Sequence, residues 1–179
     1  MGALADGEVG RYVSDHFEST YQKVGTFRVV DGVKQGGNVA AYFCLADGTV
    51  VHAVAGVVDA KRFLQEARWA VDTRKLAITQ SGGDIGKYRS VMRKGHLERL
   101  TAETGLNLPP ATLPWITTAG PPVPQMAPIR QPAGLRAGRA GQVHILLSYY
   151  PLPKLEQLYP IVFEQILGEK LSTLPVLTR

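Results

Sequence analysis

The pattern of apolar and polar positions predicts one short helix and one strand at the start of the chain. Apolar residues recur at helical spacing over residues 7–17, and Asp6 stands where an N-terminal cap is needed. Residues 19–30 are rich in β-branched and aromatic side chains, which is typical of a strand.

A β-hairpin is predicted next. Two apolar runs, residues 38–46 and 49–56, are joined at Asp47-Gly48, which is the strongest short hairpin signal. A two-residue loop at this point would pair Leu45 with Val50, Phe43 with His52 and Cys44 with Val51. Because nearly every position is apolar, we expect helices to cover both faces of the hairpin.

Two longer helices follow the hairpin. Asp59 is a natural cap for a helix over residues 60–77, and Asp84 for a second helix over residues 85–104. The first segment repeats apolar residues at i, i+3, i+4 and i+7, and is expected to bury one face. The apolar face of the second segment is formed by Tyr88, Val91, Met92, Leu97 and Leu100.

The last third of the chain alternates between a proline-rich stretch and apolar runs. Eight of the twelve prolines lie between residues 109 and 132, so residues 106–141 are expected to form an extended arm. Residues 142–150, QVHILLSYY, are predicted to form a strand. Residues 155–167 carry an apolar helical stripe interrupted by Pro160, so this helix either begins near the proline or is kinked there.

Residues 38–71, NVAAYFCLADGTVVHAVAGVVDAKRFLQEARWAV, carry a resemblance to a known family. An apolar strand, an acidic-glycine turn, a strand ending in glycine and a capped helix resemble the C-terminal half of bacterial thioredoxin-like domains. The resemblance covers about residues 1–77. It implies an α/β, thioredoxin-like three-layer sandwich in an incomplete or variant form, with residues 142–150 in the place of the missing strand.

The same resemblance implies that the redox chemistry of thioredoxin is absent from this chain. The sequence has one cysteine and therefore no Cys-x-x-Cys motif, and Ala40 stands where the family has its cis-proline. We accordingly divide the chain into a thioredoxin-like half (1–77), a basic amphipathic helix (78–105), a Pro/Gly-rich arm (106–141) and a C-terminal strand and helix (142–179).

The net charge of +5 comes from the middle of the chain. Residues 78–141 hold eight Lys/Arg and three Asp/Glu, whereas the segments before and after them are balanced. A basic helix face is formed by Lys87, Arg89, Arg93, Lys94 and Arg99. A solvated helix explains such a face, and binding to nucleic-acid phosphates is the alternative.

Cys44 and the histidines are the remaining candidates for chemistry. Cys44 lies between apolar strand residues, without the cationic neighbour or helix N-terminus that activates a thiolate, so we expect a structural cysteine. His16, His52, His96 and His144 show no metal-ligand spacing, so neither a zinc site nor another cofactor is expected.

The sequence thus favours a non-catalytic thioredoxin-like module for protein interaction or scaffolding. A protein partner or a homodimer is the expected association, because the C-terminal apolar stripe must be buried. A thiol oxidoreductase using Cys44 and a nucleic-acid binder using the basic face are the alternatives. No run of apolar residues is long enough for a membrane span, and the N-terminus lacks a signal-peptide pattern, so a cytoplasmic location is favoured.

Overall fold

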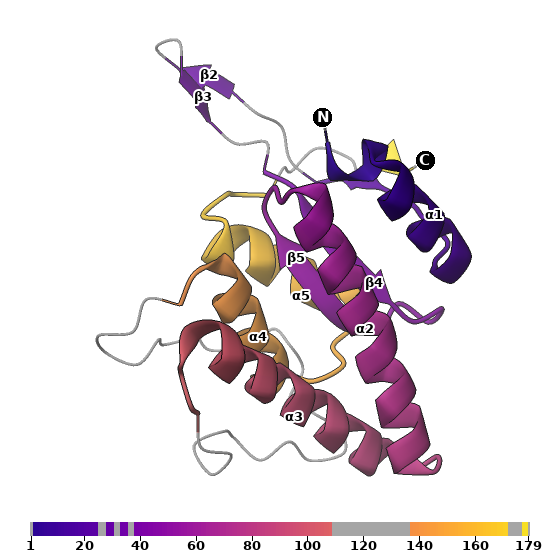
Figure 1. Ribbon diagram of the computed structural model, residues 1–179. Coiled ribbons are helices and arrows are strands. Elements are labelled where there is room, and N and C mark those ends of the chain that lie inside the picture. Colours follow the sequence, from indigo (N-terminus) through magenta and orange to yellow (C-terminus); the bar gives the residue numbers. More distant parts are fainter. Residues whose placement is uncertain are drawn as a thin grey trace.

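The computed structural model describes residues 2–24, 28–30, 33–35, 38–108, 137–171 and 177–178. After a 3₁₀ turn at Ala3–Ala5, its helices are α1 (Gly7–His16), α2 (Ala60–Ser81), α3 (Ile85–Thr104), α4 (Arg139–Tyr149) and α5 (Leu155–Ile161), and α5 continues as a π-helical segment, Val162–Ile166. Its strands are β1 (Gln22–Lys23), β2 (Arg28–Val30), β3 (Val33–Gln35), β4 (Ala40–Cys44), β5 (Val50–Ala55) and β6 (Leu177–Thr178). The strands pair antiparallel as β1–β6, β2–β3 and β4–β5. The chain is therefore a mixed α/β protein built mainly of helices (Figure 1).

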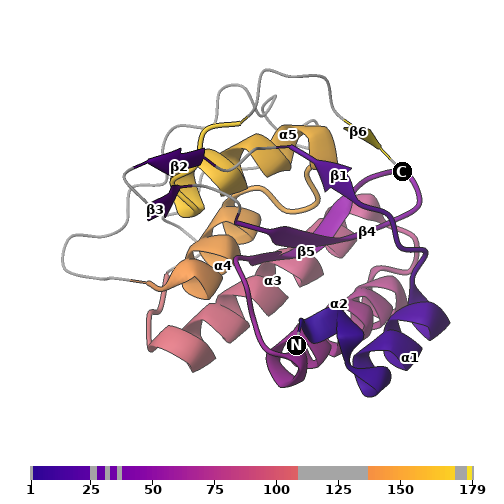
Figure 2. The ribbon, with the colours of Figure 1, turned by 90° about the horizontal axis from the view of Figure 1, so that it is seen from above.

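The β4–β5 hairpin lies at the centre of the molecule, between two layers of helices (Figure 2). On one side, Phe43 and Val54 pack with Val9 of α1 and with the apolar face of α2. On the other side, Ala53 and Ala55 belong to a core formed with α4, α5 and the π-helical segment. Every residue of β5 is buried, which confirms the prediction that helices cover both faces of this strand.

The predicted helix starts are confirmed where a local cap specifies them. The carboxylates of Asp6, Asp59 and Asp84 each accept backbone N–H groups in the first turns of α1, α2 and α3. Helix α2 is longer than predicted and ends only at Ser81, where Gly82 adopts a left-handed conformation with φ of 56°.

The prediction of a strand over residues 142–150 is wrong, because these residues lie in helix α4. Apolar side chains surround this helix on all sides, and those of Val143, Ile145, Leu146 and Leu147 are at most 2% exposed. A helix that is buried all round has a continuous apolar sequence, and periodicity does not distinguish it from a buried strand. The β4–β5 hairpin consequently gains no further strand from these residues.

The hairpin turn also differs from the prediction. Its loop has three residues, because Leu45 donates its N–H to the Thr49 carbonyl and Gly48 donates its N–H to Leu45. Gly48 has φ of 78°, as a type I turn with a glycine bulge requires. Phe43 pairs with His52 as predicted, but Cys44 pairs with Val50.

The C-terminal helix begins before its proline. Helix α5 starts at Leu155 and contains Pro160, so the first of the two alternatives for this segment is wrong. Gly168, with φ of 71°, ends the π-helical segment. Most of the predicted arm, residues 109–136, lies outside the described residues. None of the described helices is long and apolar enough to cross a membrane.

Candidate metal centre

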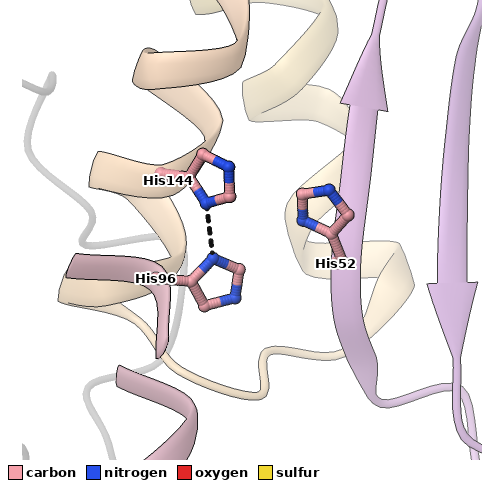
Figure 3. Close-up of side chains that lie close together, drawn as sticks. All are labelled: His52, His96 and His144. Carbon is pink, nitrogen blue, oxygen red and sulfur yellow. Dashed lines mark hydrogen bonds between the residues drawn. The ribbon is translucent and has the colours of Figure 1, made fainter. Parts of the chain in front are cut away.

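Three histidines meet in the core although they come from three separate elements. His52 lies on β5, His96 on α3 and His144 on α4, and each is at most 2% exposed. One ring nitrogen from each histidine lies within 4.8 Å of the others. Figure 3 shows the three rings turned toward a common space between the helices and the strand.

Two glycines allow the helices that carry these histidines to approach closely. A Cβ atom at Gly95, the neighbour of His96, would lie 2.9 Å from Thr73 of α2. A Cβ atom at Gly141, one turn before His144, would lie 2.9 Å from the Ala137 side chain and 3.1 Å from Thr104 of α3. Such distances are too short for a side chain, so the close packing of α2, α3 and α4 depends on glycine at both positions.

The protonation of His96 and His144 follows from their partners. His96 Nε2 lies 3.1 Å from the Val51 carbonyl oxygen, which can only accept, so Nε2 carries the hydrogen. The Nδ1 atom of neutral His96 therefore holds a lone pair. His144 Nδ1 lies 2.9 Å from it and must donate, which leaves a lone pair on His144 Nε2.

His52 is oriented by a carboxylate. Its Nε2 atom donates to Glu66 Oε2 at 2.8 Å, so its lone pair lies on Nδ1. Glu66 is 3% exposed, and its other oxygen is bound by Arg62 Nε at 2.6 Å and by Arg99 Nη2 at 2.9 Å. Because two arginines balance the Glu66 charge, the carboxylate is held in place and His52 stays neutral.

The lone pairs on His52 Nδ1 and His144 Nε2 are buried without a hydrogen-bond partner among the described residues. A buried polar atom left unpaired costs about 1–3 kcal/mol, so native proteins seldom retain two of them side by side. Burial lowers the pKa of His52, of His96 and of His144, in each case as the main cause. The histidines are therefore neutral in the folded protein, and neutral imidazole is the form that binds metals.

The surroundings of the rings match those of a metal centre. In metal sites, the nitrogen that does not bind the ion commonly donates to a carboxylate or to a backbone carbonyl. His52 donates to Glu66 and His96 donates to Val51, so both partner types are present. Trp69 of α2 borders the group, with its ring edge-on to all three histidines at centroid distances of 4.7–5.5 Å.

The distances also fit a tetrahedral ion after a small adjustment. Nitrogens bound to zinc at 2.0–2.1 Å lie about 3.3 Å apart. In this group, one ring nitrogen from each histidine lies within 4.8 Å of the others. Rotation of the rings by about 1.5 Å at their tips would bring the group to the tetrahedral spacing.

A cavity of about 190 Å³ lies beside the centre. Two of its lining residues are His52 and His144, and its outer part is formed by Val57, Arg139 and Ala140, which are exposed. Three protein ligands with access to a cavity are the arrangement of catalytic zinc sites, in which water or substrate takes the fourth position.

The predicted basic face does not form one surface. Arg99 is 15% exposed and binds Glu66 and Glu103, while its guanidinium lies 5.3 Å from the Trp69 ring centroid. Arg93 donates to the Ser148 carbonyl at the end of α4. Of the five residues, only Lys87 and Lys94 are exposed, whereas Arg89 is partly buried. Arg93 therefore connects α3 to α4, and Arg99 connects α3 to α2.

Cys44 lies apart from the histidine centre. It is half-buried, and its neighbours include the apolar core formed by β5, α4 and α5. Burial, helped by the nearby Asp47 carboxylate, raises the pKa of the Cys44 thiol to about 11. Such a thiol is protonated at neutral pH and does not act as a nucleophile.

Sequence reasoning missed the three histidines as a group. Metal ligands are recognisable in a sequence at short helical spacings, whereas His96 and His144 are 48 residues apart in the chain. The available signal was the apolar context, since His52 and His144 each stand inside an otherwise apolar run. His16, the fourth histidine, is exposed on α1 and takes no part in the centre.

No protein-family model, no curated protein and no solved structure matches this chain.

Proposed function

We propose that this protein binds a divalent transition-metal ion, with zinc as the best fit, through His52, His96 and His144. The observation that carries the proposal is the pair of unpartnered lone pairs on His52 Nδ1 and His144 Nε2, buried within the same group. A bound ion would take up these two lone pairs, and His96 Nδ1 would become its third ligand in place of the hydrogen bond from His144 Nδ1. Imidazole ligands suit zinc, copper, iron and nickel, and three histidines with an open fourth position are typical of zinc.

The role of the chain's own residues follows from their contacts. Glu66 and the Val51 carbonyl hold the hydrogens of His52 and His96, so these rings present Nδ1 to the ion. Arg62 and Arg99 fix Glu66 in turn. A bound zinc ion would act as a Lewis acid on a molecule in the adjoining cavity.

The test is a zinc titration of protein that has been dialysed against a chelator. We expect one zinc per chain, and a gain in stability of about 2.7 kcal/mol at a free zinc concentration one hundred times the dissociation constant. His144→Gln should abolish the gain, and His16→Gln is the matched control, because His16 is exposed and lies outside the centre. If zinc leaves the stability unchanged, or if it stabilises His144→Gln as well as the wild type, the three histidines are core residues only.

A thioredoxin-like scaffold for protein interaction remains a separate proposal for the remainder of the chain. Its support is the order β4, β5, α2, with Asp59 as the cap of α2, which is the order that suggested the family. The thiol oxidoreductase and the nucleic-acid binder remain predictions of the sequence. Light scattering tests self-association, and a salt-dependent shift assay with Lys94→Glu tests nucleic-acid binding.

A further inference from the structure

One end of the cavity beside the histidine centre carries a positive charge, whereas the histidines of the centre are neutral. Arg139 is exposed and lines this end, and it makes no ion pair among the described residues. The side chain lies against Gly56, where a Cβ atom would be 2.8 Å from Arg139 Nη1. Gly56 has φ of 96°, so this position keeps a glycine conformation and leaves room for the guanidinium.

The same end of the cavity contains the start of helix α4. Gly138 stands at its N-cap and has no side chain to accept from the first turn. The first intrahelical bond at this end runs from the N–H of Gln142, so the preceding N–H groups have no helical partner. Arg139 and Ala140, whose N–H groups belong to this set, both line the cavity.

Charge in the cavity is positive at this end and balanced further in. Glu66 and Arg62 also line it, but Glu66 is bound by Arg62, Arg99 and His52. Arg139 therefore remains as the charge without a counter-ion in the described part of the chain. An arginine beside uncapped N–H groups attracts an anion, and the planar guanidinium matches a carboxylate with two parallel hydrogen bonds.

The rest of the wall is apolar and the space is small. It is formed by Ala53, Val54, Ala55, Val57 and Val58, together with Ala140. The volume of about 190 Å³ is below the roughly 300–1,000 Å³ of sites for drug-sized ligands. A short hydrocarbon chain fits this wall, whereas a strongly hydrated polyanion such as phosphate does not.

We infer that this cavity binds a small carboxylate with a short hydrocarbon chain, held by Arg139 and the first turn of α4, next to the histidine centre. The two buried histidines that line the other end, His52 and His144, carry the unpartnered nitrogens. Only the role of the end lined by His52 and His144 rests on the proposed zinc site. Carboxylate binding by Arg139 and the apolar wall needs no metal. A small carboxylate is thus the substrate class on which a zinc ion at the centre would act.

Butyrate is the probe, and butyramide is its neutral control of the same shape. Titration calorimetry of the metal-free and of the zinc-loaded protein should detect butyrate in both forms and butyramide in neither. Arg139→Gln should weaken butyrate binding by roughly 10–100-fold, as expected for the loss of a charge-assisted hydrogen bond. It should leave zinc affinity unchanged. Arg11→Gln, an exposed arginine on α1, is the matched control and should change neither.

The outcomes separate the two proposals. If zinc binds but butyrate does not, or if butyramide binds equally well, the carboxylate inference is overturned and the zinc site stands. If zinc does not bind, the proposed function fails, and butyrate binding that depends on Arg139 still supports the inference. Equal affinity of Arg139→Gln and the wild type for butyrate would refute it. The inference would also be refuted if inorganic phosphate bound more tightly than butyrate, because the apolar wall would then play no part in binding.

Discussion

His96 donates its Nε2–H to the carbonyl oxygen of Val51, the residue directly before His52, at 3.1 Å. This single bond connects α3 to β5 next to the strand residue that faces the centre. It also fixes the tautomer of His96, since a carbonyl only accepts. The Val51 carbonyl therefore determines that the lone pair of His96 is on Nδ1, which is the atom that lies 2.9 Å from His144 Nδ1.

The Glu66 carboxylate gives the first prediction. Glu66→Gln keeps the shape of the side chain but removes the charge that orients His52, and loss of such a partner typically costs 10–100-fold in metal affinity. Glu103→Gln is the matched control, because Glu103 binds the same two arginines, Arg62 and Arg99, without touching His52. Competition with a chelator of known affinity measures both variants. An equal loss in both would mean that the arginine network, and not the contact with His52, determines the affinity.

The stability of the metal-free protein is predicted to fall in mild acid. Burial lowers the pKa of His52, His96 and His144 in the folded state, while in the unfolded state histidine titrates near 6.5. The unfolded chain therefore binds more protons below about pH 6.5, so the stability is fully present above this pH and is lost as the pH falls. A histidine that stays neutral in the folded protein contributes at most about 1.4 kcal/mol per pH unit below pH 6.5.

Urea unfolding between pH 8 and pH 5 measures this dependence. His144→Leu should reduce the slope, because it removes one of the three groups. A stability that is unchanged from pH 7.5 to pH 5.5 would show that the folded protein accepts protons at the centre, and would contradict the neutral tautomers derived from the hydrogen bonds.

Cys44 is predicted to react slowly. Its pKa of about 11 lies above the ordinary value of 9.0, which reduces the thiolate at pH 7.5 by roughly 100-fold. Labelling with a thiol reagent should therefore be slow in the native protein and fast in urea, where the cysteine has its ordinary pKa. Rapid, stoichiometric labelling of the native protein would instead support the thiol oxidoreductase.

The sequence predicted those parts of the fold that depend on neighbouring residues. Asp59 and Asp84 specify the starts of α2 and α3, because a carboxylate and the N–H groups it binds lie within one helical turn. The pairing of Phe43 with His52 follows from the hairpin, and it is confirmed. The position of Cys44 opposite Val50 was missed, because the glycine bulge at Gly48 lengthens the loop by one residue. A second register shift, between Phe43 and Cys44, restores the pairing of Phe43 with His52.

The candidate site was beyond sequence reasoning because long-range packing creates it. His144 was assigned to a strand, and a helix that is apolar on every side has no periodicity to correct that assignment. His52 and His96 meet only when α3 packs closely on α2, and this packing depends on the absence of a side chain at Gly95, which lies against Thr73 of α2. The basic residues on α3 suggested a surface, but Arg99 is directed inward by Glu66, a carboxylate 33 residues away in the chain.

Gly141 provides the last prediction, because it determines the distance between α3 and α4. A methyl group at this position would lie 2.9 Å from the Ala137 side chain, 3.1 Å from Thr104 and 3.5 Å from Leu100, so Gly141→Ala should displace α4 relative to Ala137 and α3 and cost about 1–3 kcal/mol of stability. The same movement should separate His144 from His96, so zinc affinity should fall together with stability.

Gly10→Ala is the matched control, since Gly10 lies within α1 and nothing would contact its added methyl group within 4 Å. Alanine is the better helix former, so this variant should be more stable than the wild type by roughly 0.5–1 kcal/mol and should bind zinc unchanged. Chemical unfolding and zinc titration of both variants provide the measurements. If Gly141→Ala is stabilised as Gly10→Ala is, or if it binds zinc like the wild type, the close approach of α3 and α4 does not control the histidine centre.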